Sequence, residues 1–574
     1  MKTEILARRA GRNLPRYTSY PTAPNFSAAV GEDDYRRWLA ELPPQLLSFY
    51  VHVPFCRSMC WYCGCHTTVT ARESPVERYL EALADEVALV AAALPGRMAV
   101  GHLHFGGGSP TIMRPEAFLA LTARIRERFD MAAEAEVAIE IDPRTLAPEM
   151  AEALARAGVN RASLGVQSFD PGVQAAINRH QPFECVADAV ARLRAHGIAA
   201  INFDLIYGLP RQSLASCMET IEQALRLAPD RLAVFGYAHV PGLKLHQRRI
   251  DAGALPQSAA RWEQARAIAE ALTSAGYVEI GLDPYARPAD SLAQAAAAGE
   301  LHRNFQGYTA DACPTLIGLG SSSIGRLPQG YVQNAVGIRD YEQRVGTGRL
   351  PVARGYAVDA DDRLRAAVIE ALMCDRKVDL EALGAEALLD EGALAPLIAD
   401  GLVIRRGFRL EVPAEARPLV RAVAAAFEDL EGVWSFLFFG YTHCPDVCPL
   451  TLSVMAALED KIGREDVKMV FVTVDPARDD TTRLAEYIGW FNEDFTGVGG
   501  TAGQIAGLAS QIGIAYQYGP PSGEGDYLVD HTSSVFLLDP QARLVSIFSA
   551  PHEVEAMLAR FRKIEEFIQS NGRS

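Results

Sequence analysis

Four cysteines fall within ten residues of the chain, directly after the segment Tyr-Val-His-Val-Pro-Phe. Cys56, Cys60 and Cys63 follow the spacing CxxxCxxC, and Cys65 comes two residues later. Three thiolates on one short loop can hold an iron–sulfur cube and leave one iron with an open coordination position. Structural zinc usually takes two separated CxxC pairs, and a fourth ligand at Cys65 would be strained. We therefore predict a 4Fe-4S cluster on Cys56, Cys60 and Cys63.

A second set of candidate metal ligands lies toward the end of the chain. Cys444 and Cys448 follow an expected strand and open an expected helix, where the helix dipole lowers thiol pKa values. His531 comes just before a later expected strand. Two thiolates and one imidazole form a soft three-coordinate set that suits copper, although either half alone could be structural or purely redox-active.

The elements that position these residues follow from the alternation of apolar segments. β-rich segments cover 47–53, 101–105, 137–141, 162–166, 200–205 and 232–237, and alanine-rich helical segments separate them. This alternation is typical of β/α units around a parallel sheet or barrel, whose loops at the carboxyl ends of the strands meet at one mouth. The sequence thus predicts an α/β protein with a partial (β/α)6 barrel.

Four domains are expected along the chain. Residues 1–45 would cover the barrel mouth, 46–250 would form the barrel, and 251–430 would form a mainly helical or winged-helix-like cap with a hairpin near 402–412. From 431 to 574, strands at 433–439 and 467–474, intervening helices, a hairpin at 534–548 and a last helix predict a thioredoxin-like domain.

Over about residues 10–430 the chain resembles the radical S-adenosylmethionine (SAM) superfamily. Within it, the chain is similar to the oxygen-independent coproporphyrinogen III oxidase family. The resemblance rests on PRYTSYPTA, YVHVPFCRSMCWYCGC, HFGGGSPT, AIEIDPRT, SLGVQSFD, INRHQ, NFDLIYGLPRQ, FGYAHVP and LHRNFQGYT. Haem-chaperone-like relatives usually lack the RYTSYPTA-type segment and the CxC cysteine, and both are present here.

The resemblance implies an activity. One SAM would bind the open iron, and its reductive cleavage would give a 5′-deoxyadenosyl radical that oxidatively decarboxylates two propionates of coproporphyrinogen III, giving protoporphyrinogen IX. An electron donor and an electron acceptor are implied as partners. The alternatives are a haem-trafficking radical-SAM-like protein without oxidase activity, and copper-chaperone function dominated by the last domain.

The resemblance also implies site residues. Catalysis would depend on the three cluster cysteines and on Tyr50. Two SAM molecules would contact Tyr50, Tyr62, Gly107, Gly108, Ser109, Glu140, Gln167, Arg179, Asp204, Ala238 and Ile324. Glycines let the backbone approach a ligand closely, and the charged residues suit the ammonium, carboxylate and ribose groups of SAM. The substrate carboxylates would take basic residues at the mouth, and the candidates are Arg16, Arg144, Arg211, Lys244 and Arg303. Pro284 stands where the family more often has histidine.

The last domain resembles the SCO/SenC family over about residues 433–560, with Cys444, Cys448 and His531 at its copper-ligand positions. The motif Val-Asp-Pro-Ala-Arg-Asp at 474–479 adds to the resemblance. That family normally carries an export or membrane-anchor segment and a leading hairpin, which we do not find here. The junction at 428–433 therefore looks like two shortened ends joined, either by gene fusion or by an error in the gene sequence.

Composition limits the remaining function classes. The 574 residues are 49% apolar and 22% charged, with a net charge of −16, which argues against nucleic acid as a partner. The sequence contains neither a secretory signal nor an apolar run long enough for a membrane span. We expect a cytoplasmic monomer. Cys185, Cys217, Cys313 and Cys374 have no predicted role.

Overall fold

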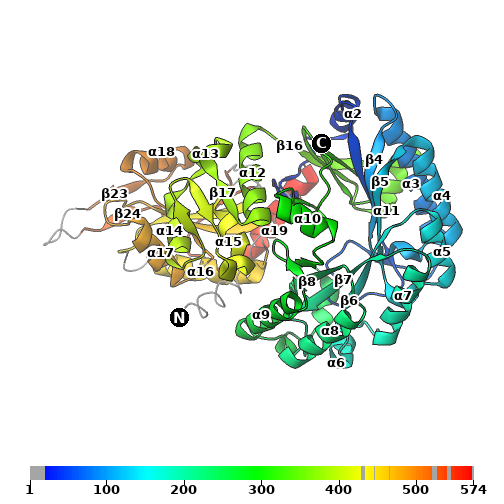
Figure 1. Ribbon diagram of the computed structural model, residues 1–574. Helices are drawn as coiled ribbons and strands as arrows, with labels where there is room; N and C mark the ends of the chain where they lie inside the picture. Colours follow the sequence, from blue (N-terminus) through cyan, green and yellow to red (C-terminus); the bar gives the residue numbers. More distant parts are fainter. Residues whose placement is uncertain are drawn as a thin grey trace.

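The computed structural model describes residues 20–241, 244–427, 433–444, 447–464, 466–492, 494–519, 527–539 and 544–571 (Figure 1). The segment expected to cover the barrel mouth is therefore described only from Tyr20 onward. The junction at 428–432 lies outside the described residues, and so does the candidate substrate ligand Arg16.

In the described part of the chain, six parallel strands form the centre of a twelve-stranded sheet, as the alternating pattern predicted. They pair in chain order. They are β1 (Leu46–Val53), β4 (Ala99–Gly107), β5 (Asp130–Ile141), β6 (Arg161–Gln167), β7 (Ala200–Tyr207) and β8 (Arg231–Gly236). Helices line the outer face of the strands (Figure 1): α3 (Ser74–Ala93), α4 (Pro115–Arg128), α5 (Pro148–Arg156), α7 (Phe183–Ala195) and α8 (Leu214–Arg226). The short α6 (Pro171–Ala176) packs instead near Trp61 and Tyr62, at the end of the strands. The loops after the strands consequently share one edge of the sheet.

Residues 278–357 extend this sheet on both sides, which the sequence did not indicate. The order is β16-β15-β14-β13-β1-β4-β5-β6-β7-β8-β10-β9. The added strands are β9 (Val278–Glu279), β10 (Pro284–Ala286), β13 (Thr315–Leu319), β14 (Ile324–Leu327), β15 (Gly330–Asn334) and β16 (Val352–Ala357). β13 and β15 are buried at every position, so they lack the alternation of apolar and polar residues that marks a strand in a sequence. Part of the expected helical cap therefore belongs to the barrel sheet.

The helices and the hairpin expected between residues 251 and 430 are present. The helices are α9 (Ser258–Ser274), α10 (Ser291–Ala298), α11 (Ile338–Gly346), α12 (Ala360–Asp375), α13 (Leu380–Leu383), α14 (Glu391–Ala399) and α15 (Val420–Ala424). The hairpin of β18 (Ile404–Arg406) and β19 (Arg409–Glu411) pairs with β17 (Lys377–Asp379). Leu372, Leu402 and Val423 are fully buried in the apolar core that these elements share. Nearer the start of the chain, α2 (Glu32–Ala40) precedes β1.

The last part of the chain has the predicted thioredoxin-like arrangement. Among its described residues, the strand order is β22-β21-β20-β25-β26, and the first three strands are parallel. The strands are β20 (Trp434–Gly440), β21 (Val467–Thr473), β22 (Thr496–Val498), β25 (Val535–Leu538) and β26 (Leu544–Phe548). The helices are α16 (Val447–Ile462), α17 (Thr481–Gly489), α18 (Ala502–Ile512) and α19 (Val554–Asn571), and β23 (Tyr516–Tyr518) pairs with β24 (Val529–His531).

Apolar side chains of the central strand β20 pack on both faces of this sheet. Phe436 and Phe438 pack on one face with residues of α16 and α19, and Leu437 and Phe439 pack on the other. Within the described residues of the whole chain, the helices lack the combined length and apolar character needed to cross a membrane.

Candidate functional site

The cysteine loop begins where β1 ends, at the edge of the sheet that carries the polar loops. Each of the three cysteines predicted to hold the cluster has a hydrogen-bond donor on its sulfur. Thr67 Oγ1 donates to Cys56 Sγ at 3.2 Å, Arg179 Nη1 donates to Cys60 Sγ at 3.5 Å, and the Cys65 amide donates to Cys63 Sγ at 3.4 Å. Donors of this kind favour the thiolate, which is the form that binds metal.

Residues far away in sequence hold the backbone of the cysteine loop. Asn178 Nδ2 donates to the Met59 carbonyl at 2.8 Å, and Gln247 Nε2 donates to the Tyr62 carbonyl at 3.0 Å. A ring nitrogen of His246 lies 2.7 Å from the Cys63 carbonyl oxygen. Sequence reasoning missed all three positioning residues; only Asn178, in the matched segment INRHQ, carried any signal.

The spacing of the three sulfurs argues against a single bound ion. A tetrahedral zinc site brings its sulfur ligands to about 3.8 Å from one another. Among the described residues, the sulfurs of Cys56, Cys60 and Cys63 do not form a set whose members all lie within 4.8 Å. The three sulfurs are therefore not arranged as the ligands of one ion. Hydrogen bonds from the thiol and the amide of Cys65 lower the pKa of Cys63 to about 6.

The glycines at the end of β4 and directly after it are required by close packing at the mouth. A Cβ on Gly106 would lie 2.8 Å from both Glu140 Oε1 and Tyr50 Cε2. At Gly107, where φ is +113°, a Cβ would lie 2.6 Å from the His52 ring. A Cβ on Gly108 would lie 2.5 Å from the Phe55 carbonyl oxygen, at the start of the cysteine loop. The buried Ser109 follows directly.

Two buried carboxyl groups of the barrel, those of Glu140 and Asp204, have pKa values shifted in opposite directions. Glu140, on β5, accepts from the Gly107 amide at 3.0 Å and lies 3.3 Å from His104 Nε2. Burial raises the pKa of Glu140, but the hydrogen bond and charge of His104 and the Gly107 amide outweigh it, so that the pKa lies below its usual value. Burial and the charge of Glu140 raise the pKa of Asp204, on β7, to about 7. Ser163 Oγ donates to Asp204 at 3.2 Å.

Arg179 connects the cysteine loop with the end of β6. Its guanidinium is buried and donates to Cys60 Sγ, to the Gly165 carbonyl at 2.5 Å and to Asp142 at 3.4 Å. The Arg179 Nε is buried and has no hydrogen-bond partner among the described residues. Gln167 ends β6 with φ at +67°, a left-handed conformation that is strained for a non-glycine residue and common at functional sites.

The other predicted SAM-contacting residues lie on three further elements. Tyr62, in the cysteine loop, packs against an apolar cluster that includes Ile177 and Tyr237. Ala238 follows β8 by two residues, so it lies in a loop at the same edge of the sheet. Ile324 begins β14 beside Gly318, which pairs with Tyr50. The sheet thus gathers the predicted residues at one mouth.

The basic candidates for substrate binding are distributed less uniformly. Arg144 Nη2 contacts Asp142 at 2.6 Å and Cys60 Sγ at 3.6 Å, so its charge is already partnered. Lys244 Nζ donates to the Cys65 carbonyl at 3.3 Å, beside the cysteine loop. Arg211 lies in the loop after β7 and is exposed. The Arg303 guanidinium lies over the ring of Tyr308, 4.4 Å from its centre, and Tyr308 is on β12 (Gly307–Thr309).

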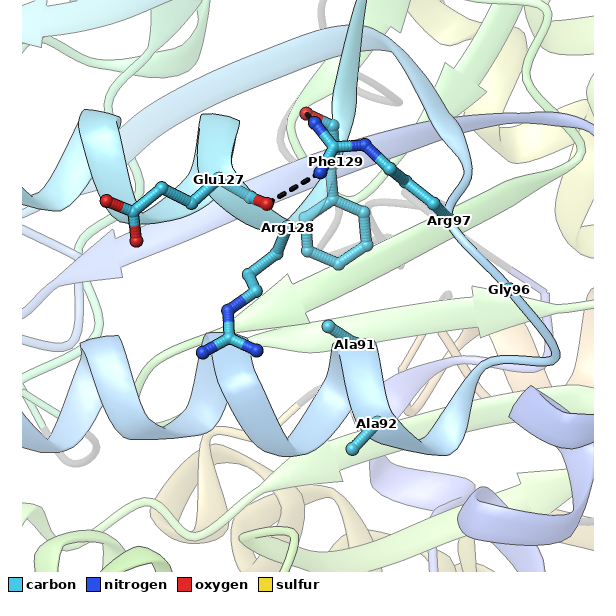
Figure 2. A pocket seen from close by; sticks show the side chains of 7 residues that line it. All are labelled: Ala91, Ala92, Gly96, Arg97, Glu127, Arg128 and Phe129. Carbon is cyan, nitrogen blue, oxygen red and sulfur yellow. Dashed lines mark hydrogen bonds between the residues drawn. The ribbon is translucent and has the colours of Figure 1, made fainter.

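Pro284 and one cavity of the structure both lie outside the cysteine loop. Pro284 is on β10 and pairs with Ala233 of β8. A cavity of about 310 Å³ lies between the ends of α3 and α4 and is lined in part by Arg97, Arg128 and Phe129 (Figure 2). It opens where β4 and β5 begin, the opposite end of the strands from the mouth. Arg97 there donates to Asp130 and to the Glu127 carbonyl, which stabilises the end of α4.

The second predicted metal site is assembled from three segments. The ligand atoms of Cys444, Cys448 and His531 all lie within 4.8 Å of one another, and Cys448 Sγ is 3.3 Å from His531 Nε2. His531 Nδ1 lies 3.1 Å from the Thr532 carbonyl, which suits a donor there and leaves Nε2 to bind a metal. The hydrogen bond with Cys444 and burial raise the pKa of Cys448, so the expected lowering by the helix dipole is outweighed.

Comparison with known proteins decides the family. Residues 50–224 match the model of the radical SAM superfamily. The oxygen-independent coproporphyrinogen III oxidase of Bradyrhizobium diazoefficiens is 55% identical over 436 residues, which cover 75% of this chain and 97% of that protein. The chain belongs to the oxygen-independent coproporphyrinogen III oxidase family. The predicted class of enzyme is thereby confirmed.

Further members support this assignment. The Escherichia coli oxidase of the same name is 39% identical over 422 residues, 72% of this chain and 92% of that protein. The solved structure of coproporphyrinogen III oxidase from Escherichia coli, a radical SAM enzyme, covers 72% of this chain and 96% of its own with a TM-score of 0.69. Residues 422–566 match the SCO1/SenC family model, so this oxidase-family chain also carries a SCO1/SenC domain.

Proposed function

We propose that the chain converts coproporphyrinogen III to protoporphyrinogen IX by oxidative decarboxylation of two propionates. Each propionate loses a hydrogen atom, carbon dioxide and one electron, and a vinyl group remains. The hydrogen atom goes to a 5′-deoxyadenosyl group, and the electron goes to an acceptor. When bound, a reduced 4Fe-4S cluster and SAM supply the radical for this chemistry. The named relatives, of which the chain covers more than nine-tenths, support this substrate.

The observation that carries the proposal is the position of Arg179. One guanidinium contacts the sulfur of Cys60, the end of β6 and Asp142, and it retains a buried Nε without a partner among the described residues. A planar fork of N–H donors suits a carboxylate. The guanidinium of Arg179 would hold the carboxylate of a SAM bound beside Cys60. The donors on Cys56, Cys60 and Cys63 suit the thiolates that would hold the cluster.

The remaining interior residues orient SAM in this proposal. Glu140 stays ionised and accepts the ammonium group, and Asp204 takes ribose hydroxyls. Gly107 and Gly108 let their own backbone lie close to His52 and Phe55, where a Cβ would clash, and so present backbone groups to SAM at the mouth. We also propose that two SAM molecules bind at the mouth. The remaining residues that would contact this pair are Ala238, Ile324, Tyr50, Tyr62, Ser109 and Gln167.

A basic side chain beside the cysteine loop is the candidate contact for the substrate carboxylates in this proposal. Lys244 Nζ lies beside the cysteine loop, where a point charge could orient a propionate. An external electron donor reduces the cluster, and a separate acceptor takes the electron lost from each propionate.

We propose that the enzyme acts as a monomer in the cytoplasm, where thiols stay reduced.

Replacing Cys60 by alanine tests the cluster assignment. After anaerobic reconstitution, the wild-type protein should bind four irons and form vinyl product with coproporphyrinogen III, SAM, a reductant and an electron acceptor, and Cys60→Ala should lose both properties. Cys185→Ala, which removes a cysteine outside the loop, should retain both. Full iron loading and product formation by Cys60→Ala would refute the assignment. A loaded wild-type protein that cleaves SAM without forming product would favour the haem-trafficking alternative.

A copper site in the SCO1/SenC domain is the second proposal. The three ligand atoms lie close enough for one ion, and two thiolates with an imidazole suit copper. We expect one copper per chain, lost in Cys444→Ala, Cys448→Ala and His531→Ala. The control is His443→Ala, which removes an imidazole next to Cys444 but outside the three-ligand set. Copper binding at the wild-type level by the three ligand variants as well as by His443→Ala would exclude the site.

A further inference from the structure

A buried carboxylate lies behind the loop that joins β13 to β14. Glu86, on α3, is 1% exposed and receives three hydrogen bonds. Its Oε2 accepts from the Gly320 amide at 2.7 Å and from the Tyr341 hydroxyl at 2.6 Å. Its Oε1 accepts from Asn334 Nδ2 at 2.6 Å. Three donors from separate segments thus converge on one buried carboxyl group, which anchors the loop that it faces.

The loop anchored by Glu86, residues 320–323, has a backbone that needs support. Gly320 has φ at +94°, and a Cβ there would lie 2.5 Å from the His52 carbonyl oxygen. Ser322 has φ at +61°, which is strained for a residue with a side chain. Asn334 Nδ2 donates to the Gly320 carbonyl at 2.9 Å and to Ser323 Oγ at 3.1 Å. The conformation of loop 320–323 therefore depends on the group formed by Glu86 and Asn334.

The same loop borders the predicted SAM site. Tyr79 OH accepts from the Ser321 amide at 2.8 Å and donates to the His52 carbonyl at 2.8 Å, four residues before Cys56. Ile324, a predicted SAM contact, follows the loop directly. Hydrogen bonds therefore link Glu86 to loop 320–323, and this loop is linked in turn to His52 of β1 and to Ile324 at the start of β14. None of the predicted SAM contacts includes Glu86.

We propose that Glu86 is a positioning residue for SAM. It fixes loop 320–323 and so sets the placement of Ile324 against the cofactor, without touching SAM or the cluster itself. This inference rests on the proposed contact between Ile324 and SAM. The hydrogen bonds that hold Cys56, Cys60 and Cys63 do not involve Glu86, so cluster assembly should be independent of it.

Glu86→Gln tests the proposal because it keeps the shape of the side chain and replaces one acceptor oxygen by a donor. The new amide would then face either the Asn334 amide or the donors from Gly320 and Tyr341. Glu81→Gln is the matched control, because Glu81 is exposed on the same helix. Equilibrium SAM binding, iron content and SAM cleavage are measured on the reconstituted full chain.

We expect about tenfold weaker SAM binding in Glu86→Gln, since leaving one buried donor without its acceptor has an effect of that order. The KM for SAM should rise while kcat and iron content stay near the wild-type values, and Glu81→Gln should match the wild type. Tyr341→Phe removes only one donor and should weaken SAM binding about threefold. That variant keeps the test decisive if Glu86→Gln does not fold.

Several outcomes would overturn the inference. Unchanged SAM affinity in a folded Glu86→Gln, or unchanged affinity in Tyr341→Phe when Glu86→Gln does not fold, would refute it. A parallel loss of iron and SAM binding would indicate a general structural role instead, and so would a fall in kcat at constant KM. Failure of the wild-type protein to form vinyl product would contradict the proposed function but would leave the comparison of SAM affinities intact.

Discussion

Replacing Gly107 by alanine would strain the backbone at the barrel mouth and would crowd the ring of His52. Gly107 has φ at +113°, and holding a residue with a Cβ in such a region costs about 1–3 kcal/mol. The new Cβ would lie 2.6 Å from the His52 ring, which must move by about 1 Å to restore an ordinary carbon–carbon separation. That movement would break the 3.2 Å contact of His52 with Tyr50 and the 3.1 Å contact with the His66 carbonyl.

Loss of two hydrogen bonds corresponds to about 1–3 kcal/mol, or roughly tenfold to hundredfold weaker SAM binding. The assay is equilibrium SAM binding to cluster-loaded protein, with thermal unfolding measured in parallel. Gly96→Ala is the control, because a Cβ on Gly96 would meet no atom within 4 Å. We expect the control to match the wild type. Wild-type affinity in Gly107→Ala would refute the argument that close packing at this glycine shapes the SAM site.

Two further predictions concern charged groups. Arg179→Met should weaken SAM binding about a hundredfold, and Arg179→Lys should restore little of it because a lysine lacks the planar fork of donors; near-normal affinity in calorimetric titrations of either variant would contradict the assigned role. Burial raises the pKa of Glu86 from 4.5 to about 7, so the protonated form is favoured in the folded state. The stability that this shift contributes is fully present below pH 4.5 and is lost as pH rises through 7, a change of roughly 3 kcal/mol. Glu86→Gln should therefore flatten the pH dependence of unfolding by denaturant between pH 5 and 8, and an unchanged slope in that window would contradict the shift.

Local patterns were enough to predict the architecture that carries the chemistry. Strands such as β1 and β7 combine a short apolar segment with a polar loop, and the CxxxCxxC spacing marks the cluster loop without any tertiary information. The thioredoxin-like order of the last domain follows from the same kind of pattern. The parallel arrangement then brings interior residues in the carboxyl-terminal halves of their strands, such as Glu140 of β5 and Asp204 of β7, close together.

The contacts that hold the site come from residues with no local signature. β13 and β15 are buried throughout, so their pattern does not differ from that of a buried helical segment. Gln247 reaches the cysteine loop across 185 sequence positions. Glu86 lies within a regular helical segment, and only its burial against β13, β15 and α11 distinguishes it from the exposed Glu81. Such contacts depend on tertiary packing, which one sequence does not specify by pattern.

The most direct test of the central claim is the stoichiometry of one anaerobic reaction. Full-length protein with a reconstituted cluster is mixed with coproporphyrinogen III, SAM, a reductant and an electron acceptor. The protoporphyrinogen IX, carbon dioxide and 5′-deoxyadenosine formed are then counted by mass spectrometry. We expect two carbon dioxide and two 5′-deoxyadenosine molecules per protoporphyrinogen IX, from the full chain and from a version ending near residue 430. SAM cleavage without vinyl product, or product without SAM cleavage, would contradict the assignment.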